Sequence, residues 1–299
     1  MPEARFLYRN CLGGFAFDRN NSIVDSGSLD ELKKKHPEAE IITMPSLQIL
    51  EAFKYEKHFK KFREYNIELA KKKVKESFTR DQLIVQTVSV IEDLDKAFNS
   101  LVKRLRDWYA LQSPEIVHAL EGHERFVKSV VSKEPKELIA ELNLDGKMGA
   151  DLPSDDYGMI MQLAHMVEGL NQLKDEQDRY LEVLMKEIAP NVHAIAGTMI
   201  GAKLISIARG LEKLSKFPAS TLQLLGAEKA LFRHLKTGAK SPKYGVLIMH
   251  PLVANAKKSD KGKVARALAD KISIASKVDY FRGDPIGEKL RKDMEAKFG

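Results

Sequence analysis

Cysteine is almost absent from this chain, since Cys11 is the only one among 299 residues. A single cysteine excludes a disulfide framework and a thiolate metal cluster, so we expect a protein of the reducing cytoplasm. Leu12, Phe15 and Phe17 lie next to Cys11, which predicts that its thiol is packed and unreactive. No run approaches 18 uncharged apolar residues, so we expect no membrane span. The N-terminus also lacks the cationic-then-apolar layout of a secretion signal.

Recognisable catalytic patterns are missing as well. The eight histidines are scattered and form no His-Glu-x-x-His pattern, so we expect no metal site. The segment 238–241 lacks the Gly-Lys pair of a phosphate-binding loop, and Gly13-Gly14 lacks the helix entry of a dinucleotide fold. No glycine-rich strand–turn–helix pattern predicts a pocket for S-adenosylmethionine. We therefore expect no catalytic residue and no cofactor, and the chain is predicted not to be an enzyme.

Positive charge is concentrated in the last third of the chain. Residues 191–299 hold 21 Lys and Arg against 9 Asp and Glu, a net charge of +12, whereas residues 1–190 carry a net charge of −5. A basic end on a mildly acidic body predicts one polyanion-binding module attached to a protein-binding part.

The fold class is predicted to be mainly α, with a small α/β domain at the N-terminus. Residues 5–8, 14–17 and 40–43 are short strand-like runs, and Ser28 before Leu29-Asp30-Glu31 marks the start of a helix that reaches Lys35. Residues 46–78 read as a connecting helix with a solvated, mixed-charge surface; a contact of its lysines with an RNA backbone is the alternative.

Two long helical patterns follow, each with apolar residues at spacings of three and four. The first holds Ile84, Val88, Ile91, Leu94, Phe98, Leu101, Leu105 and Trp108, and the second holds Leu163, Val167, Leu170, Leu173, Gln177, Leu181, Leu184 and Ile188. Such spacing predicts a long antiparallel coiled coil. About 45 residues with their own apolar positions join the two patterns and predict a helical tip. Pro190 ends the second pattern, and a compact all-helical domain is expected after it.

The segment 226–236 predicts a helix with two unlike faces. Lys229, Arg233 and Lys236 fall within about 60° of one another, whereas Leu231 and Leu235 lie roughly opposite and are expected to dock on a core. Gly226 and Ala227 leave the N–H groups at its start open to a phosphate. Further cations and small residues surround this helix, namely Lys216, Lys240, Ser241, Pro242 and Lys243. Such cations bind phosphates without reading bases.

Several short sequence motifs in a fixed order accompany this helix. Among them are Ala189-Pro-Asn191, Phe217-Pro-Ala-Ser-Thr221, Leu225-Gly-Ala-Glu-Lys-Ala-Leu-Phe-Arg233, Ser241-Pro-Lys-Tyr-Gly245 and Ser273-Ile-Ala-Ser276. They resemble the Nop domain of the scaffold proteins in box C/D guide ribonucleoproteins, which has a spliceosomal relative. The resemblance is close over about residues 186–282 and looser over the long helices before them.

The resemblance implies a function and its partners. It implies a scaffold for RNA-guided 2′-O-methylation of rRNA or tRNA, whose N-terminal domain holds a fibrillarin-type methyltransferase carrying S-adenosylmethionine. It implies that the Nop domain binds a box C/D guide RNA at a kink-turn already occupied by a small ribosomal-type kink-turn-binding protein. The implied contacts are Gly226, Ala227, Glu228, Lys229 and Arg233, with the 241–244 loop behind them, whereas Phe217, Pro218, Leu231 and Phe232 are expected to be structural.

The resemblance also implies a homodimer formed by the coiled coil. The expected dimerisation seam is Ile84, Val88, Ile91, Phe98, Leu101, Leu105, Leu163, Val167, Leu170, Leu181 and Leu184; an intramolecular two-helix stalk is the alternative. The expected divisions are a methyltransferase-binding domain with linker helix (1–78), the coiled coil (79–189), the Nop domain (190–285) and a charged tail (286–299). Because no long Lys/Glu-rich tail follows, we expect an archaeal form. A spliceosomal-type adaptor and a coiled-coil assembly protein with a non-specific basic end remain as alternatives.

Overall fold

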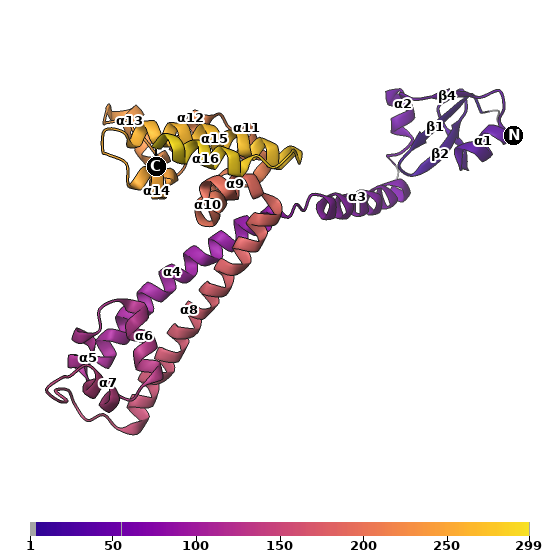
Figure 1. The fold of residues 1–299 in the computed structure, drawn as a ribbon. Helices are drawn as coiled ribbons and strands as arrows, with labels where there is room; N and C mark the ends of the chain where they lie inside the picture. Colours follow the sequence, from indigo (N-terminus) through magenta and orange to yellow (C-terminus); the bar gives the residue numbers. More distant parts are fainter. Residues whose placement is uncertain (1–3, 55, 299) are drawn as a thin grey trace. The chain divides into compact units, whose positions relative to one another are not determined.

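The computed structural model describes residues 4–54 and 56–298 and is mainly helical. Its contacts divide the chain into two compact units, Met1–Phe78 and Thr79–Gly299. Because the placement of these units relative to one another is not determined, each is described by itself (Figure 1).

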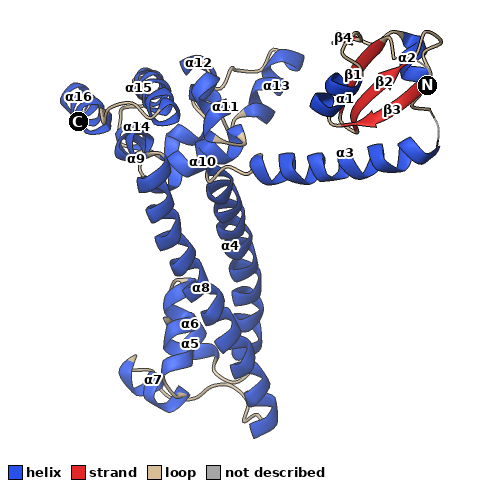
Figure 2. Cartoon of the chain, turned by 90° about the vertical axis from the view of Figure 1, so that its right-hand side faces the viewer, coloured by secondary structure: helices blue, strands red, loops and turns tan. Residues whose placement is uncertain are grey.

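The first unit is built on a four-stranded mixed sheet, whose strands are red in Figure 2. Its strands are β1 (Phe6–Asn10), β2 (Gly13–Phe17), β3 (Ile23–Gly27) and β4 (Glu40–Ile42), in the order β3-β2-β1-β4. β2 pairs antiparallel with both β1 and β3, and β4 runs parallel to β1. The helix α1 (Leu29–Lys35) connects β3 to β4 and so allows β4 to run parallel to β1. It begins at a capping box between Ser28 and Glu31.

Alternation along β2 gives this sheet two packed faces. Leu7 and Ala16 face Leu32 of α1, whereas Phe15 and Phe17 pack with Ile49 of α2 (Leu47–Glu51) on the other side. The strands and helix expected here are confirmed, but β3 was missed. Cys11 was expected to be packed and is exposed instead, because it lies in the turn between β1 and β2. The unit ends with α3 (Glu56–Glu76), a largely exposed helix. The single connecting helix expected over 46–78 is therefore only partly right, because α2 is separate from α3 and buries Ile49 against the sheet.

A two-helix stalk begins the second unit. α4 (Asp81–Tyr109) and α8 (Ser154–Ile188) run antiparallel and side by side, as the apolar spacing predicted (Figures 1 and 2). The segment between them forms the tip, with α5 (Pro114–Ala119), α6 (His123–Ser132) and α7 (Pro135–Glu141). Arg106 of α4 joins the tip to the stalk. Its guanidinium donates to the carbonyls of Val117, Leu120 and Gly122 and lies 4.4 Å from the centre of the Phe126 ring.

Most residues of the expected dimerisation seam are buried between elements of one chain. Ile84, Val88, Ile91, Leu181 and Leu184 are buried in the core of the C-terminal part. Phe98, Leu105 and Val167 are buried in the core of the tip, whereas Leu101, Leu163 and Leu170 are half-buried. The buried side chains hold α4 against α8 in an intramolecular stalk, and a dimer through this seam stays a prediction.

A helical domain follows the stalk and packs around α15 (Lys261–Phe281), whose Leu268, Ala269 and Ile272 are fully buried. Its remaining elements are α9 (Pro190–Ala196), α10 (Thr198–Ala208), α11 (Leu211–Lys216), α12 (Ala219–Leu224), α13 (Glu228–Thr237), the 3₁₀ helix η1 (Val246–Met249), α14 (Pro251–Ala254) and α16 (Gly287–Phe298). The expectation of a charged tail at 286–299 is wrong, because α16 packs against α9 and buries Leu290 and Met294.

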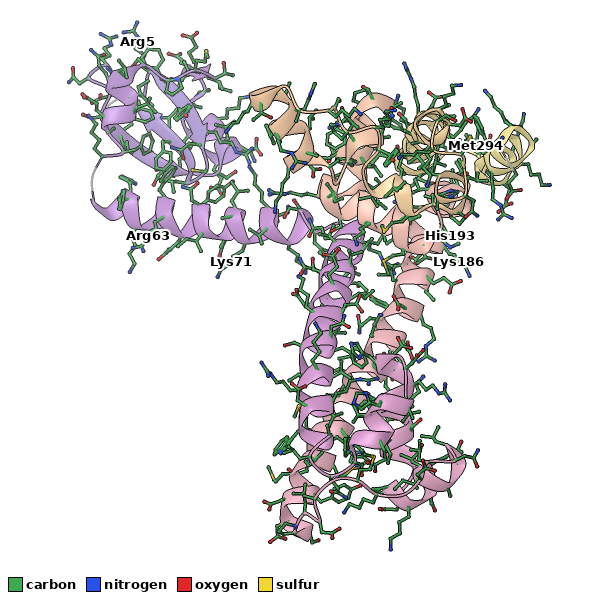
Figure 3. The ribbon with its side chains drawn as sticks, turned by 90° about the vertical axis from the view of Figure 1, so that its left-hand side faces the viewer. Arg5, Arg63, Lys71, Lys186, His193 and Met294 are labelled. Atoms are coloured by element: carbon green, nitrogen blue, oxygen red, sulfur yellow. The ribbon has the colours of Figure 1, made fainter. Side chains whose placement is uncertain are left out.

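A buried hydrogen-bond network joins three helices where the stalk meets this domain. The Asp279 carboxylate accepts from the main-chain N–H groups of Asn191 and Val192 at 3.0 and 2.9 Å, and from the Asn191 side chain at 2.7 Å. The side-chain oxygen of Asn191, Oδ1, in turn accepts from Ile286 N and Gly287 N, each at 2.7 Å. The network therefore ties the start of α9 to the end of α15 and the start of α16. Figure 3 labels His193 and Lys186 near this junction, and Met294 among the C-terminal helices.

Contacts from the stalk also fix the other edge of the domain. The Asp81 carboxylate, at the start of α4, accepts a hydrogen bond of 2.7 Å from Leu211 N at the start of α11. Lys203 of α10 forms a 3.1 Å ion pair with Glu92 of α4. Both connections lie within the second unit, so the stalk and the helical domain form one body.

Candidate nucleic-acid interface on α13

Two glycines determine how the cationic helix α13 begins. Gly226 has a φ of +84°, and a Cβ there would lie 2.6 Å from Val246 Cγ2, so both conformation and space require glycine. A Cβ on Gly245 would lie 1.8 Å from Leu225 O. The main chain can therefore run close enough for Gly245 N and Val246 N to donate to Gln223 O and Leu225 O at 2.9 and 2.8 Å.

These hydrogen bonds hold the loop 241–245 against the start of α13. Gln223 adds a third link, because its side-chain amide donates to Lys243 O at 2.6 Å. The loop therefore lies at the base of the helix, where the resemblance implied it. Gly238, with a left-handed φ of +66°, ends α13. Lys240 lies in the turn that follows the helix, and Lys243 lies in the loop 241–245.

The α13 cations form an exposed row without internal partners. Lys229, Arg233 and Lys236 lie on one helix face and are exposed, as are Lys240 and Lys243. Across residues 4–54 and 56–298, no ion pair involves any of these five side chains. Because nothing in the described chain neutralises them, the row can take phosphates without first breaking an ion pair.

The N-terminus of α13 offers fewer N–H groups than its sequence indicated. Gly226 N donates to Glu228 Oε1 at 2.7 Å, so this group is already satisfied, and by a carboxylate. The N–H groups of Glu228, Lys229 and Ala230 begin the first turn, where a helix has no internal acceptors. These three N–H groups, together with the cations, make the site suited to an anion.

The apolar side of α13 is not docked as expected. The helix has no buried residue; Leu231 is half-buried, but Phe232 is 62% exposed and Leu235 is 69% exposed. Phe232 was expected to be structural and Leu235 to dock on the core, and both expectations are wrong. At 100° per residue, Phe232 lies only about 60° from Lys229, so its ring borders the cationic row. That angle was the signal in the sequence that pointed to Phe232 as a surface residue.

Lys216 belongs to a different part of the surface. It lies on α11 and pairs with Glu212 at 2.5 Å. The next residue, Phe217, accepts a hydrogen bond from Ser273 in the middle of α15. The start of α15 lies instead near Lys243, since Gly262 borders that side chain. Eleven helical residues, about 16 Å, separate Gly262 from Ser273.

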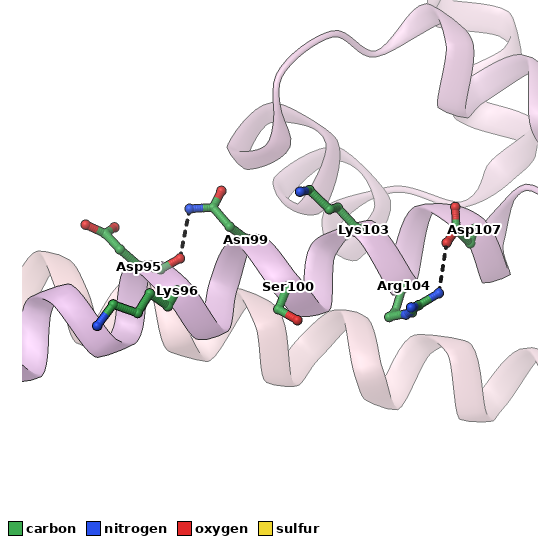
Figure 4. A pocket seen from close by; sticks show the side chains of 7 residues that line it. All are labelled: Asp95, Lys96, Asn99, Ser100, Lys103, Arg104 and Asp107. Carbon is green, nitrogen blue, oxygen red and sulfur yellow. Dashed lines mark hydrogen bonds and ion pairs between the residues drawn. The ribbon is translucent and has the colours of Figure 1, made fainter.

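Elsewhere the described residues offer little for chemistry. No group of three or more His, Cys, Asp or Glu among them could hold a metal ion. An open groove runs along α4 and is lined by Asp95, Lys96, Asn99, Ser100, Lys103, Arg104 and Asp107, all from one helix (Figure 4). Its charges are mixed, and Asp107 pairs with Arg104. No helix in the described part combines the length and apolar character needed to cross a membrane.

A helical stalk carries a helical domain that presents an exposed cationic helix, and this arrangement can be compared with known proteins. The Nop family model, described as "snoRNA binding domain, fibrillarin", matches residues 90–299, more than two thirds of the chain. The chain therefore belongs to the Nop-domain family, and the resemblance found in its sequence is confirmed.

Two curated relatives agree with this assignment, and one solved structure is similar. An uncharacterised NOP5 family protein of Methanocaldococcus jannaschii is 41% identical over 261 residues, which cover 81% of this chain and 63% of the relative. Nucleolar protein 56 of Macaca fascicularis is 36% identical over 75% of this chain and 42% of its own length. A chain in a crystal structure of a fibrillarin/Nop5p complex is similar with a TM-score of 0.49 at 23% identity, covering 98% of both chains. The chain spans between about two fifths and two thirds of the length of the two curated relatives.

Proposed function

We propose that this chain is the non-catalytic scaffold of a box C/D ribonucleoprotein that directs RNA-guided 2′-O-methylation of rRNA or tRNA. The observation that carries the proposal is the unpaired cationic row on α13, placed on the Nop domain beside a loop that glycine packing holds in position. Family membership supports the choice of RNA as the polyanion. The methyl donor, S-adenosylmethionine, would be held by the partner enzyme.

Each part of the chain has a proposed partner. Residues 1–78 would hold a fibrillarin-type methyltransferase, and residues 79–189 form the stalk. The Nop domain at 190–285, with α16 packed against it, would bind the kink-turn of the guide RNA together with a small ribosomal-type kink-turn-binding protein. The first of these assignments rests on the resemblance of the chain to scaffold proteins that hold such an enzyme.

The α13 site would contribute affinity and position more than base recognition. Lys229, Arg233 and Lys236 contact phosphates, which neutralises charge without selecting a sequence. Phe232 lies beside them with most of its ring exposed, so it can cover an unpaired base or the end of a duplex. The two kinds of contact together favour a folded RNA of defined shape.

A homodimer remains part of the proposal, but on a different surface of the stalk. Met159, Met166, Leu173 and Tyr180 recur every seven residues along α8 and are between 41% and 63% exposed. Apolar side chains at heptad spacing form one row on a helix and pack well against a second copy. We propose this row, and not the buried seam, as the dimer contact.

The scaffold would act by positioning. Bound to the RNA at one end and to the methyltransferase at the other, it raises the effective concentration of the enzyme at one target nucleotide. The stalk and the Nop domain belong to one body, joined by the Asn191–Asp279 network and the Asp81–Leu211 hydrogen bond. Such rigidity suits a part that must hold two partners in register.

The experiment is a gel-shift titration of the full chain on a kink-turn RNA, with and without the small kink-turn-binding protein, at several salt concentrations. We expect tight binding only when that protein is present. Lys229→Ala with Arg233→Ala should weaken this binding and lower the slope of log K against log salt by about two. Lys289→Ala with Lys292→Ala on α16 removes the same charge from exposed positions and should leave the slope nearly unchanged.

Two other functions predict different results. A coiled-coil assembly protein with a non-specific basic end would bind kinked and straight RNA equally and ignore the small protein. A spliceosomal-type adaptor would bind the composite of RNA and small protein but would not retain a fibrillarin-type methyltransferase in a pull-down. Either result would overturn the scaffold proposal.

A further inference from the structure

Two neighbouring aromatic side chains are exposed at the C-terminal end of α15. Phe281 is 75% exposed and Tyr280 is 38% exposed. Their rings lie 5.0 Å apart between centroids and are inclined by 72°. Arg282 follows in the left-handed conformation with a φ of +54° and ends the helix, so the aromatic pair lies at its last turn.

Folding does not explain this exposure. α15 buries the opposite side, which includes Ile272, Ala275 and Asp279. At 100° per residue, Phe281 lies about 120° or more from each of these residues and within about 40° of the exposed Lys277. A phenylalanine ring left in water contributes nothing to the core, whereas an exposed ring with a basic neighbour is suited to a ligand.

Two cations lie next to the aromatic pair along the chain. Lys277 lies one turn before Phe281 and Arg282 follows it, and the neighbouring helix α11 carries Lys213 and Lys216. α11 is held against α15 by packing and by the Ser273 hydroxyl, which donates to Phe217 O at 3.3 Å.

The acidic neighbours leave a positive excess at this place. Glu212 pairs with Lys216, and Asp284 is exposed in the following loop. Lys213, Lys277 and Arg282 form no ion pair with any described residue. Exposed rings among cations with no ion-pair partner match the arrangement that binds single-stranded nucleic acid, in which bases stack on rings and phosphates meet cations. A protein partner would need a broader apolar surface than two rings provide.

We propose that Tyr280 and Phe281, with Lys277 and Arg282, form a second RNA site that takes a single-stranded segment. The proposal rests on the proposed function only in taking RNA as the polyanion. The site is separate from α13, because the start of α15 lies near Lys243 and nineteen helical residues, about 28 Å, separate Gly262 from Phe281.

The experiment uses the full chain with two RNAs that share one kink-turn, one of them extended by ten unpaired uridines, each bound to the small kink-turn-binding protein. A free ten-nucleotide oligouridylate is the third probe. We expect the extension to tighten binding by the wild-type chain. Phe281→Ala should remove roughly tenfold in affinity on the extended RNA and on free oligouridylate, and leave the short RNA unaffected.

Further variants test the chemistry of the site. Phe281→Leu keeps an apolar side chain but cannot stack, so it should behave like Phe281→Ala, whereas Phe281→Trp should restore binding. Trp108→Ala removes an exposed aromatic residue from α4, outside both proposed RNA sites and the proposed dimer row, and should have no effect on binding. A 4-thiouridine in the extension should crosslink to a peptide that contains residues 280–281.

Several results would overturn the proposal. If Phe281→Ala binds the extended RNA and free oligouridylate as well as the wild-type chain, no single strand stacks there. If Phe281→Leu retains full affinity, the contact is apolar and not a stacked base. A different result would refute the α13 proposal. If Lys229→Ala with Arg233→Ala leaves binding to the short RNA unchanged, α13 does not bind RNA, and this outcome does not depend on the effect of the Phe281 variants.

Discussion

Asn191 offers the sharpest test of how the stalk is joined to the Nop domain. Its side-chain amide donates to Asp279, and its carbonyl oxygen accepts from Ile286 N and Gly287 N, all at 2.7 Å. Asn191 is 3% exposed, so water cannot readily replace these partners. Asn191→Ala would remove three hydrogen bonds and leave two main-chain N–H groups at the start of α16 without an acceptor.

The expected cost follows from these contacts. A main-chain N–H buried without a partner costs about 1–3 kcal/mol, and the lost bond to the Asp279 carboxylate adds a further contribution. We expect Asn191→Ala to lower the free energy of unfolding by about 3–4 kcal/mol. For a cooperative unit the size of Thr79–Gly299, such a loss lowers Tm by roughly 10 °C.

Thermal and urea unfolding followed by circular dichroism would measure this loss. Asn99→Ala is the matched control, because Asn99 is exposed on α4 and only bonds back to Asp95 O; it should change stability by less than about 0.5 kcal/mol. A loss below about 1 kcal/mol for Asn191→Ala would refute the reasoning, since the network would then not hold α16.

Asn191→Asp is a second variant that separates charge from shape. It keeps the acceptor for Ile286 N and Gly287 N but places a second carboxylate against Asp279. Burial already raises the pKa of Asp279 above its ordinary value, although its three hydrogen bonds oppose this effect. A raised carboxyl pKa means that stability is lost as the pH rises through it. The variant should therefore recover stability as the pH falls from neutral, and the wild-type chain should not recover to the same extent.

Two further predictions concern a half-buried histidine and the stalk surface. Burial lowers the pKa of His250 below 6.5, so its contribution to stability is present above that pH and lost as the pH falls through the folded-state pKa. His250→Gln should therefore weaken the loss of Tm between pH 7.5 and 5.5. Met166→Glu with Leu173→Glu should convert a dimer to a 33.7 kDa monomer in light scattering, whereas Val90→Glu on α4 should not; a monomeric wild-type chain contradicts the proposed dimer row.

The long elements were predictable because many residues repeat one local signal. Apolar spacing of three and four over about 25 residues predicted α4 and α8, and Pro190 marked the start of α9. Short or sparse patterns failed. β3 was missed because Asp25, Ser26 and Gly27 break its alternation. α16 was read as a tail because it buries little beyond Leu290 and Met294 among many charges.

The candidate site was also predictable only in part. Sequence spacing placed Lys229, Arg233 and Lys236 on one helix face, and the sequence motifs of the Nop domain pointed to the loop beside them. Spacing could not show that α13 leaves Phe232 exposed, because a helical wheel gives the direction of a side chain and not what it meets. Nor could the position of Lys216 in the sequence reveal that the end of α11 meets α15 at Ser273, away from Lys243.

By itself the sequence determined the long helices, the charge of the last third and the family, because each depends on local periodicity, composition or residue identity. Only the tertiary structure decided which partner covers each apolar face. It buried most of the expected dimer seam inside the stalk, left Met166 and Leu173 exposed, and left Tyr280 and Phe281 exposed at the end of α15. The physical reason is that burial is a property of contacts between segments distant in the chain, and a local pattern records only that a face needs a partner.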